Sequence, residues 1–373
     1  MALNHWFHVL RVRRGLSWWR IPRSIRSKLL FSGDIGKRLD SCQWYDSSDW
    51  KPDGVRISIG SSFLSTTFKF SALHYAVATN VELVGIHATP VLENSEIVLT
   101  SKRDSPGLFL EELDEFDDRL VPAPSTNKVF LSALVLSLAS RLDVVYYHWV
   151  TEQLPQIFAL VEAAADTGNN PVVILRKDRP SFQDSSIKAL FPDVTIVDYY
   201  CAVTVPHLLL STIPTIGYAA HPVVLRLRNH AFAAVARVVA TDQQRIYVKR
   251  KIGGWRYILN EDEVIALLSS LGFTIIDAAE YSFVEQIQLF RNASCVVSIF
   301  GSGLTNILFC CDANVIELAG DYADTCFASI SGHVGNKHTR LNCVSTGDNI
   351  TVDLYKLKEK LSALGVLNAA LVG

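Results

Sequence analysis

Residues 245–319 read RIYVKRKIGGWRYILNEDEVIALLSSLGFTIIDAAEYSFVEQIQLFRNASCVVSIFGSGLTNILFCCDANVIELA, and their hydrophobic pattern decides the fold. Apolar and β-branched runs predict four strands: Arg245–Arg250, Thr274–Asp277, Cys295–Phe300 and Val315–Leu318. Helices are predicted between them, from Asn260, from Ser282 and from about Leu304; Glu263 and Glu285 complete capping boxes for the first two. Strands that alternate with helices predict a parallel, doubly wound sheet.

The turn 300–306 directly follows the most apolar of these strands. In parallel sheets ligands bind at the carboxyl ends of strands, where helix N-termini offer free N–H groups. Gly301 and Gly303 allow a diphosphate to approach the backbone, and the hydroxyl of Ser302 or Thr305 can add a hydrogen bond. The alternative is a tight turn without a ligand, because a single G-x-G is a weak signal.

Three polar residues favour the anion site. Arg250 ends its strand, Arg256 follows the Lys251–Gly254 loop, and Asn260 begins the next helix. We therefore expect all three at the same edge of the sheet as the glycine turn. Arginine suits this place because its planar guanidinium binds phosphate oxygens in a bidentate way.

Several motifs of this region, in the same order and at similar separations, carry a family resemblance. They are Arg250, Arg256 and Asn260-Glu261, then Leu271-Gly272-Phe273, SFVEQIQLF at 282–290, the glycine turn, Val315-Ile316-Glu317, and YYHWVTEQLP at 146–155. Together they resemble the family-61 glycosyltransferases, a group of capsular polysaccharide and O-linked glycan transferases. The family often has His before the glycine turn, where this chain has Phe300. A hydrogen bond from that position is therefore in doubt, whereas the backbone cradle is not.

The resemblance implies a GT-B type α/β architecture, in which two Rossmann-like doubly wound domains face a cleft. A chain of 373 residues is also longer than a domain with a single hydrophobic core usually is. We expect a basic, aromatic N-terminal segment over residues 1–45, an acceptor domain with a β-rich lead-in over 46–238, and a nucleotide-sugar domain with a C-terminal helix over 239–373. The remaining predicted elements are strands Val55–Ile59, Val81–His87, Ile97–Leu99, Pro171–Arg176, Val194–Tyr200 and His207–Ser211, and helices His148–Ala165, Ser185–Leu190, His221–Ala240 and Val352–Leu364.

The implied reaction moves a sugar from a nucleotide-sugar donor to a hydroxyl of a glycan or glycolipid acceptor, in surface or capsular polysaccharide synthesis. An inverting displacement needs a base for the acceptor proton and positive groups for the departing diphosphate. His148 and Glu152 are four residues apart and share a helix face. Either can be the base; we favour His148, with Glu152 orienting it. The alternative is that both serve helix capping and packing beneath Trp149.

The donor is expected to bind to Arg250, Arg256 and the amides of Gly301, Ser302 and Gly303. Glu317 or Asn306 is predicted to meet the ribose or the donor sugar. The sequence contains no D-x-D triplet, the usual carboxylate clamp for a metal-bound sugar nucleotide. We therefore predict metal-independent transfer from a UDP-sugar, with no cofactor.

Composition limits the other partners. A net charge of −2 predicts no general attraction to nucleic acid, and seven cysteines without a C-x-x-C pair indicate reduced thiols in a cytoplasmic protein. Residues 1–33 hold seven cations and no acid, with Trp6, Trp18 and Trp19 among them. This segment is either a site of contact with an anionic membrane surface or a basic tail.

Two other functions fit parts of the pattern. A strand, G-x-G and helix also suit an NAD-dependent oxidoreductase, but the third glycine of that fingerprint is absent, because Asn306 follows instead. A non-catalytic scaffold that binds a sugar or nucleotide is the other, and Phe300 keeps it open. Nucleotide binding without any transfer would distinguish the scaffold from the enzyme.

Overall fold

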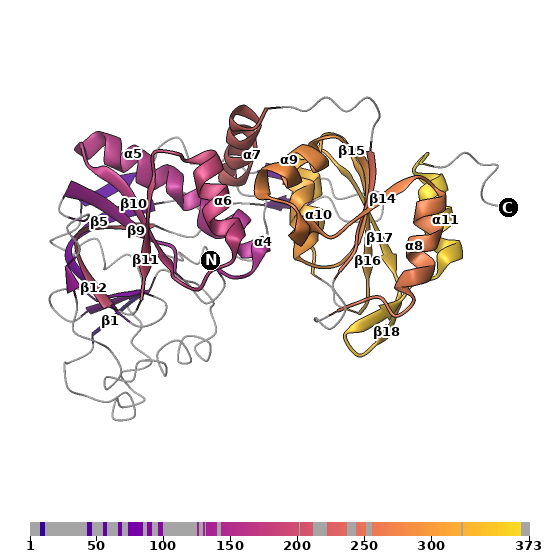
Figure 1. Cartoon of the computed structure of the whole chain (residues 1–373), viewed down its shortest axis with the longest axis horizontal. Coiled ribbons are helices and arrows are strands. Elements are labelled where there is room, and N and C mark those ends of the chain that lie inside the picture. The colour runs from indigo at the N-terminus through magenta and orange to yellow at the C-terminus, as the bar shows by residue number, and fades with distance from the viewer. Residues whose placement is uncertain are drawn as a thin grey trace. The chain divides into compact units, whose positions relative to one another are not determined.

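The computed structural model describes residues 8–11, 43–46, 55–57, 66–68, 74–84, 88–91, 96–99, 125–126, 130, 132–139, 143–200, 202–211, 222–236, 244–250, 256–321 and 324–366. It divides into two compact units (Figure 1). Unit 1 comprises Met1–Pro52 and Phe70–Ile216, and unit 2 comprises Asp53–Lys69 and Gly217–Gly373. Apart from strand β1 (His8–Arg11), the predicted membrane-contact segment 1–33 lies outside the described residues, as does the Lys251–Gly254 loop.

Unit 1 is built on one mixed sheet, in the order β1-β7-β6-β5-β12-β9-β10-β11. Its strands, with β2 and β8 paired beside the main order, are β2 (Gln43–Asp46), β5 (His74–Val84), β6 (Thr89–Val91), β7 (Glu96–Leu99), β8 (Ser125–Thr126), β9 (Ala133–Ser137), β10 (Asn170–Arg176), β11 (Thr195–Tyr199) and β12 (Ala202–Ser211). The part β11-β10-β9-β12 is parallel, while β5 pairs with β12 antiparallel. The β-rich lead-in therefore extends the parallel sheet and does not form a separate layer.

The predicted single helix His148–Ala165 is wrong in detail, because the structure breaks it into four pieces. They are α4 (Tyr146–His148), a π-helical turn (Trp149–Gln153), a 3₁₀ turn (Leu154–Gln156) and α5 (Ile157–Thr167). Pro155 accounts for the break, since it lacks the N–H that an α-helix needs and its ring clashes with the carbonyl four residues earlier. Helix α5 packs on β9 and β10, and α6 (Ser181–Leu190) follows β10.

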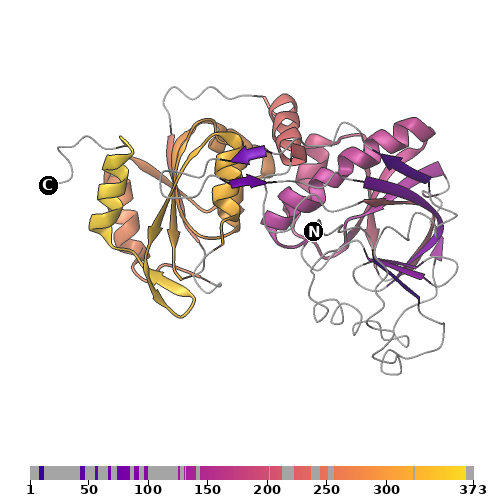
Figure 2. The ribbon, with the colours of Figure 1, turned by 180° about the vertical axis from the view of Figure 1, so that it is seen from behind.

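Unit 2 holds a five-stranded sheet that is parallel throughout, in the order β14-β13-β15-β16-β17. The strands are β13 (Gln244–Val248), β14 (Phe273–Ile276), β15 (Ala293–Ile299), β16 (Asn314–Ala319) and β17 (Lys337–Asn342). Helices α8 (Glu261–Ser270) and α11 (Leu354–Ala363) cover one face, and α9 (Phe283–Arg291) and α10 (Cys326–Val334) cover the other (Figures 1 and 2). The doubly wound sheet predicted for 245–319 is present.

The core of this sheet follows the period of two expected for strands. Alternate strand residues such as Tyr247, Val297 and Ile316 are buried with Val264 of α8 and Leu357 of α11. The predicted capping box at Ser282 is confirmed: the Glu285 N–H donates to Ser282 Oγ at 3.3 Å, and the Ser282 N–H donates to Glu285 Oε2 at 2.7 Å.

Helix α7 (Pro222–Ala234) belongs to unit 2, so the two units divide at Ile216–Gly217, earlier in the chain than the expected 238–239 boundary. Arg228 donates from Nε to Leu308 O and from Nη2 to Cys310 O, both at 2.8 Å. The guanidinium groups of Arg228 and Arg291 also lie 4.5 Å and 4.2 Å from the ring centroid of Phe232. These contacts attach α7 to the sheet unit that follows it.

The hairpin β3 (Val55–Ile57) and β4 (Thr66–Phe68) also belongs to unit 2, where it lies beside α10 (Figure 2). The sequence did not predict α10, β17 or the hairpin of β18 (Val344–Thr346) and β19 (Asn349–Thr351). The helix expected from Leu304 is a 3₁₀ helix that begins earlier, η7 (Ser302–Phe309). In the part of the chain that the structure describes, no helix has the length and hydropathy needed to cross a membrane.

Candidate functional site

The candidate site lies in unit 2, at the carboxyl ends of β13 and β15. From β13 the chain first adds β14 on one side and then returns to add β15, β16 and β17 on the other side. The strand order therefore reverses between the neighbouring strands β13 and β15. In open parallel sheets this reversal leaves a crevice outside the carboxyl ends of the strands, and ligands bind there. Arg250 follows β13 by two residues, and Gly301 follows β15 by two residues.

Arg250 reaches from one strand end to the other, as the sequence predicted. Its Nη1 donates to the carbonyl oxygen of Phe300 at 3.4 Å. A Cβ placed on Gly301 would lie 2.5 Å from that same Nη1, although the Gly301 φ of 170° is extended backbone that any residue adopts. A larger residue at 301 would therefore displace the guanidinium of Arg250 from its present place. At Gly303 an added Cβ would lie 3.1 Å from Cγ1 of Val248, so the turn packs closely on β13.

Arg256 reaches the same turn from a separate segment. Its Cζ lies 5.1 Å from the ring centroid of Phe300, and its own backbone is left-handed, with a φ of 62°. The pKa of Arg250 is lowered, first by burial and then by the charge of Arg256. Two cations held this close favour an anion between them, because an anion would relieve both the repulsion and the loss of hydration.

A strand-like pairing fixes the backbone that follows Arg256. The Ile350 N–H donates to Tyr257 O at 3.1 Å, and the Leu259 N–H donates to Ile350 O at 2.8 Å. Asn260 continues the pairing through its side chain: Nδ2 donates to Val352 O at 3.0 Å, and Oδ1 accepts from the Val352 N–H at 2.9 Å.

The predicted capping box at Asn260 is therefore wrong, since its side chain makes no hydrogen bond to the N–H groups of α8. It contacts Glu263 only through Nδ2, 3.2 Å from Oε2. The amide of Asn260 is engaged by Val352, so its contribution to this site is to hold the segment that carries Arg256. A direct contact with a donor remains a prediction.

Asn306 and Glu317, the other predicted donor-binding residues, are fully buried. Nδ2 of Asn306 donates to Gln286 Oε1 at 2.7 Å, which connects η7 to α9. Glu317 Oε2 lies 2.9 Å from Nε2 of His338, and Glu317 Oε1 lies 2.7 Å from Nη2 of Arg340. Both side chains thus brace the layers of unit 2, and their roles at a ribose or sugar remain predictions.

The two hydroxyl groups of the turn differ in burial. Ser302 is partly exposed in the first turn of η7, which suits a residue that meets a ligand. Thr305 is fully buried, and its Oγ1 has no hydrogen-bond partner among the described residues.

His148 and Glu152 form a close pair in unit 1. Nδ1 of His148 lies 3.0 Å from Oε1 of Glu152, although the two atoms are not aligned as a well-formed hydrogen bond. The Glu152 side chain is 6% exposed and that of His148 is 17% exposed. With Nδ1 directed at Glu152, Nε2 is the nitrogen left to exchange a proton with a substrate. The pair spans the junction of α4 and the π turn, and such turns are frequent at functional sites.

An ion pair that was not predicted from the sequence holds the chain just before the His148–Glu152 pair. Asp143, which is fully buried, accepts from Nε of Arg176 at 3.0 Å and from Nη2 at 2.6 Å. Arg176 ends β10, so the bidentate contact holds the residues just before α4 against the carboxyl edge of the sheet. Gln183 donates from Nε2 to Asp143 O at 2.8 Å. The spacing of 33 residues between the two charges gave no local signal of the pairing.

Within the described residues, no three side chains of His, Cys, Asp or Glu lie close enough together to hold a metal ion. The described cations of the candidate site are Arg250 and Arg256. Five described cysteines are free thiols: Cys295, Cys310, Cys311, Cys326 and Cys343. Cys42 and Cys201 lie outside the described residues.

Comparison with known proteins gives a family match. The family model described as Glycosyltransferase 61 matches residues 146–316, a range that includes both the His148–Glu152 pair and the glycine turn. No curated protein matches the chain.

Three solved structures are similar at low identity. The dodecameric iron-containing heptosyltransferase TibC, in complex with ADP-D-β-D-heptose, is 12% identical over 79% of this chain and 85% of that chain, with a TM-score of 0.31. TibC from enterotoxigenic E. coli H10407 is also 12% identical, over 68% and 67%, with a TM-score of 0.28. The E. coli heptosyltransferase WaaC with ADP is 10% identical over 62% and 99%, with a TM-score of 0.30.

Proposed function

We propose that this chain, whose residues 146–316 match the model of the glycosyltransferase 61 family, transfers a sugar from a nucleotide-sugar to a hydroxyl of a glycan or glycolipid acceptor. The proposed transfer inverts the anomeric configuration and needs no metal ion. Its product is part of a surface or capsular polysaccharide.

One observation carries the proposed donor site. Arg250 and Arg256 come from separate segments and meet at Phe300, beside a turn in which a Cβ on Gly301 would clash with the Arg250 guanidinium. In the proposed complex the diphosphate lies against the amides of 301–303, and both guanidinium groups neutralise its charge. These contacts strengthen as the bond to the sugar breaks, because negative charge then grows on the departing diphosphate.

The proposed base is His148, oriented by Glu152. The acceptor hydroxyl gives its proton to Nε2 of His148 while its oxygen attacks the anomeric carbon of the donor sugar. The new bond forms on the face opposite to the bond that breaks, and the nucleoside diphosphate leaves with the electron pair. Glu152 stabilises the imidazolium that results, since its carboxylate lies 3.0 Å from Nδ1.

The proposal also includes a UDP-sugar as the donor and a GT-B arrangement in which the two units face a cleft. It places the protein in the cytoplasm, with residues 1–33 in contact with the anionic inner face of a membrane. The cations and tryptophans of that segment support the last point.

The experiment is a thermal-shift screen of the purified protein against UDP, GDP, CMP, UDP-sugars and NAD, with and without EDTA. We expect one nucleoside diphosphate to raise the melting temperature, insensitively to EDTA. Arg250→Ala should abolish this shift. Arg245→Ala is the matched control, because Arg245 lies near the amino end of the same strand, where Nη1 donates to Leu271 O.

Each other outcome contradicts part of the proposal. A shift with NAD alone would favour an oxidoreductase, and no shift with any nucleotide would refute the donor site. Binding without transfer to any glycan acceptor would favour the non-catalytic scaffold. An EDTA-sensitive shift would refute metal-independent binding of the donor.

A further inference from the structure

Phe300 lies between the two cations of the proposed diphosphate site. Its carbonyl oxygen accepts from Nη1 of Arg250 at 3.4 Å, and its ring lies 5.1 Å from Cζ of Arg256. The side chain is almost fully buried, at 7% exposure. From this geometry we infer that Phe300 is a positioning residue, whose ring holds the guanidinium of Arg256 at the glycine turn, beside the Arg250 that its backbone carbonyl accepts from. The inference rests on the proposed function, because it assigns the two arginines to a diphosphate.

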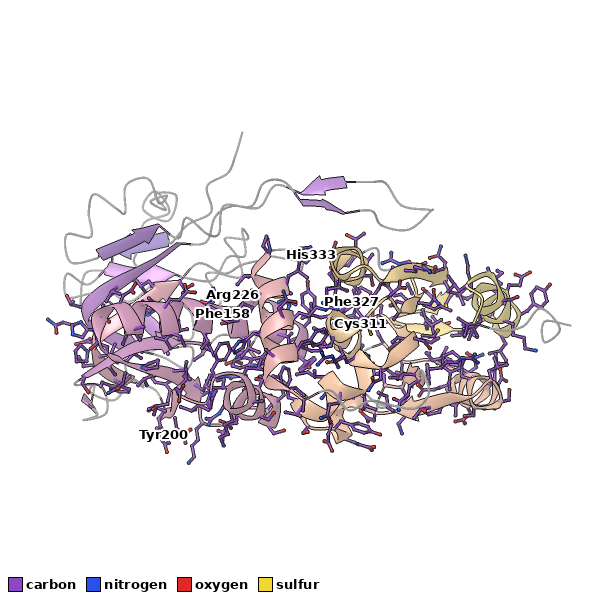
Figure 3. All side chains as sticks on the ribbon, turned by 90° about the horizontal axis from the view of Figure 1, so that it is seen from above. Phe158, Tyr200, Arg226, Cys311, Phe327 and His333 are labelled. Atoms are coloured by element: carbon purple, nitrogen blue, oxygen red, sulfur yellow. The ribbon has the colours of Figure 1, made fainter. Side chains whose placement is uncertain are left out.

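The Phe300 ring also packs against α10. Phe327 of α10, labelled in Figure 3, meets the Phe300 ring edge-on at a centroid distance of 5.0 Å. Helix α10 is held to the sheet by a buried polar chain, in which Ser331 Oγ lies 2.9 Å from Nδ1 of His338 and Nε2 of His338 lies 2.9 Å from Glu317 Oε2. Arg340 adds a donation from Nη2 to Asp324 O, just before the helix. The ring therefore has little freedom to turn away from Arg256.

A ring holds a cation without neutralising it. The face of the phenyl group attracts a guanidinium through its quadrupole, by about 0.5–2 kcal/mol depending on desolvation. A carboxylate in the same place would also hold Arg256, but it would cancel the positive charge that a diphosphate needs. An aromatic residue thus keeps Arg256 beside Arg250 with both charges available to a ligand.

The test measures binding of UDP and of inorganic pyrophosphate by titration calorimetry in EDTA. Phe300→Leu and Phe300→Met remove the ring and keep an apolar side chain, and Phe300→Tyr keeps the ring. We expect the two ring-free variants to bind pyrophosphate about 5- to 10-fold more weakly, and Phe300→Tyr to stay within about two-fold of the wild type.

Phe273→Leu is the matched control. Phe273 is buried to a similar degree, at 5% exposure, but it is the first residue of β14 and so lies at the amino ends of the strands, away from the glycine turn at their carboxyl ends. This variant loses a comparable ring from the same unit, so its melting temperature should fall while its affinity for pyrophosphate stays unchanged. A loss of affinity in Phe273→Leu equal to that of Phe300→Leu would mean that general loosening explains both, and would overturn the inference.

A double-mutant cycle separates positioning from simple support of the fold. If Phe300 acts through Arg256, Phe300→Leu should weaken binding in the wild type and change nothing further in an Arg256→Ala background. Equal losses in both backgrounds, or unchanged binding in Phe300→Leu, would overturn the inference. A wild-type protein that binds neither UDP nor pyrophosphate would instead refute the proposed function itself.

Discussion

Substituting Gly301 by alanine tests the candidate site with the smallest possible change. The added Cβ would lie 2.5 Å from Nη1 and 3.4 Å from Cζ of Arg250, so the guanidinium must shift from its present place. The backbone tolerates alanine, because its φ of 170° is extended. Gly→Ala at a tolerant position also stabilises a protein by about 0.4–1 kcal/mol, because alanine lowers the conformational entropy of the unfolded chain. We therefore expect the free energy of unfolding to change by about 1 kcal/mol or less.

The effect on the ligand should be much larger. A hydrogen bond to a charged group contributes about 1.5–3 kcal/mol, so displacement of Arg250 should weaken nucleoside diphosphate binding about 10- to 150-fold. The assay is titration of the same nucleotide into wild type, Gly301→Ala, Arg250→Ala and the double variant. Since alanine at 301 acts by moving Arg250, the double variant should bind no worse than Arg250→Ala.

Two results would refute this reasoning. One is an affinity of Gly301→Ala within two-fold of the wild type, which would mean that Arg250 does not bind the ligand from its present place. The other is a further 10-fold loss when alanine at 301 is added to Arg250→Ala, which would show that the alanine acts on the ligand at the backbone and not by moving Arg250.

Three further predictions concern other parts of the molecule. His148→Ala should lower the transfer rate by about 10²- to 10⁴-fold without changing the nucleotide affinity, measured by product formation and by titration; a parallel loss of affinity would contradict a role as the base. Glu317→Gln should lower the free energy of unfolding by about 3 kcal/mol, because Arg340 would lose a buried partner; urea unfolding measures this, and a change below about 1 kcal/mol would disprove it. Burial raises the pKa of Cys343 to about 11, so at pH 8 only about one thiol in a thousand is ionised, and we expect a thiol reagent to label exposed Cys311 well before Cys343; equal rates would contradict this.

The parallel sheet of unit 2 was predictable because its signals are local. Runs such as Val296–Val297 are apolar enough for a strand buried on both faces, and the Ser282–Glu285 spacing fixes a helix start by contacts only three residues apart. The meeting of Arg250 with the glycine turn followed from the same logic, since parallel strands end at one edge.

The features that escaped prediction depend on contacts between distant residues. Asn260 was expected to cap its own helix, but it pairs with Val352, which lies 92 positions later. Strand β17 lacks the apolar pattern that predicts a buried strand, because its His338 and Arg340 pair with buried Glu317. The break at 149–156 did have a local signal in Pro155, which outweighs the apolar periodicity around it.

Because of the π turn at Trp149–Gln153, the direction of the His148 side chain depends on the number of residues in that turn. A π turn amounts to one surplus residue in the path of an α-helix, and each residue of such a helix advances it by about 100°. Removing one residue from the turn would therefore rotate everything before it by roughly that angle relative to α5. The imidazole would then point elsewhere, although its identity and its neighbours in sequence stayed the same. Insertions and deletions here should thus be as damaging as replacement of the histidine itself.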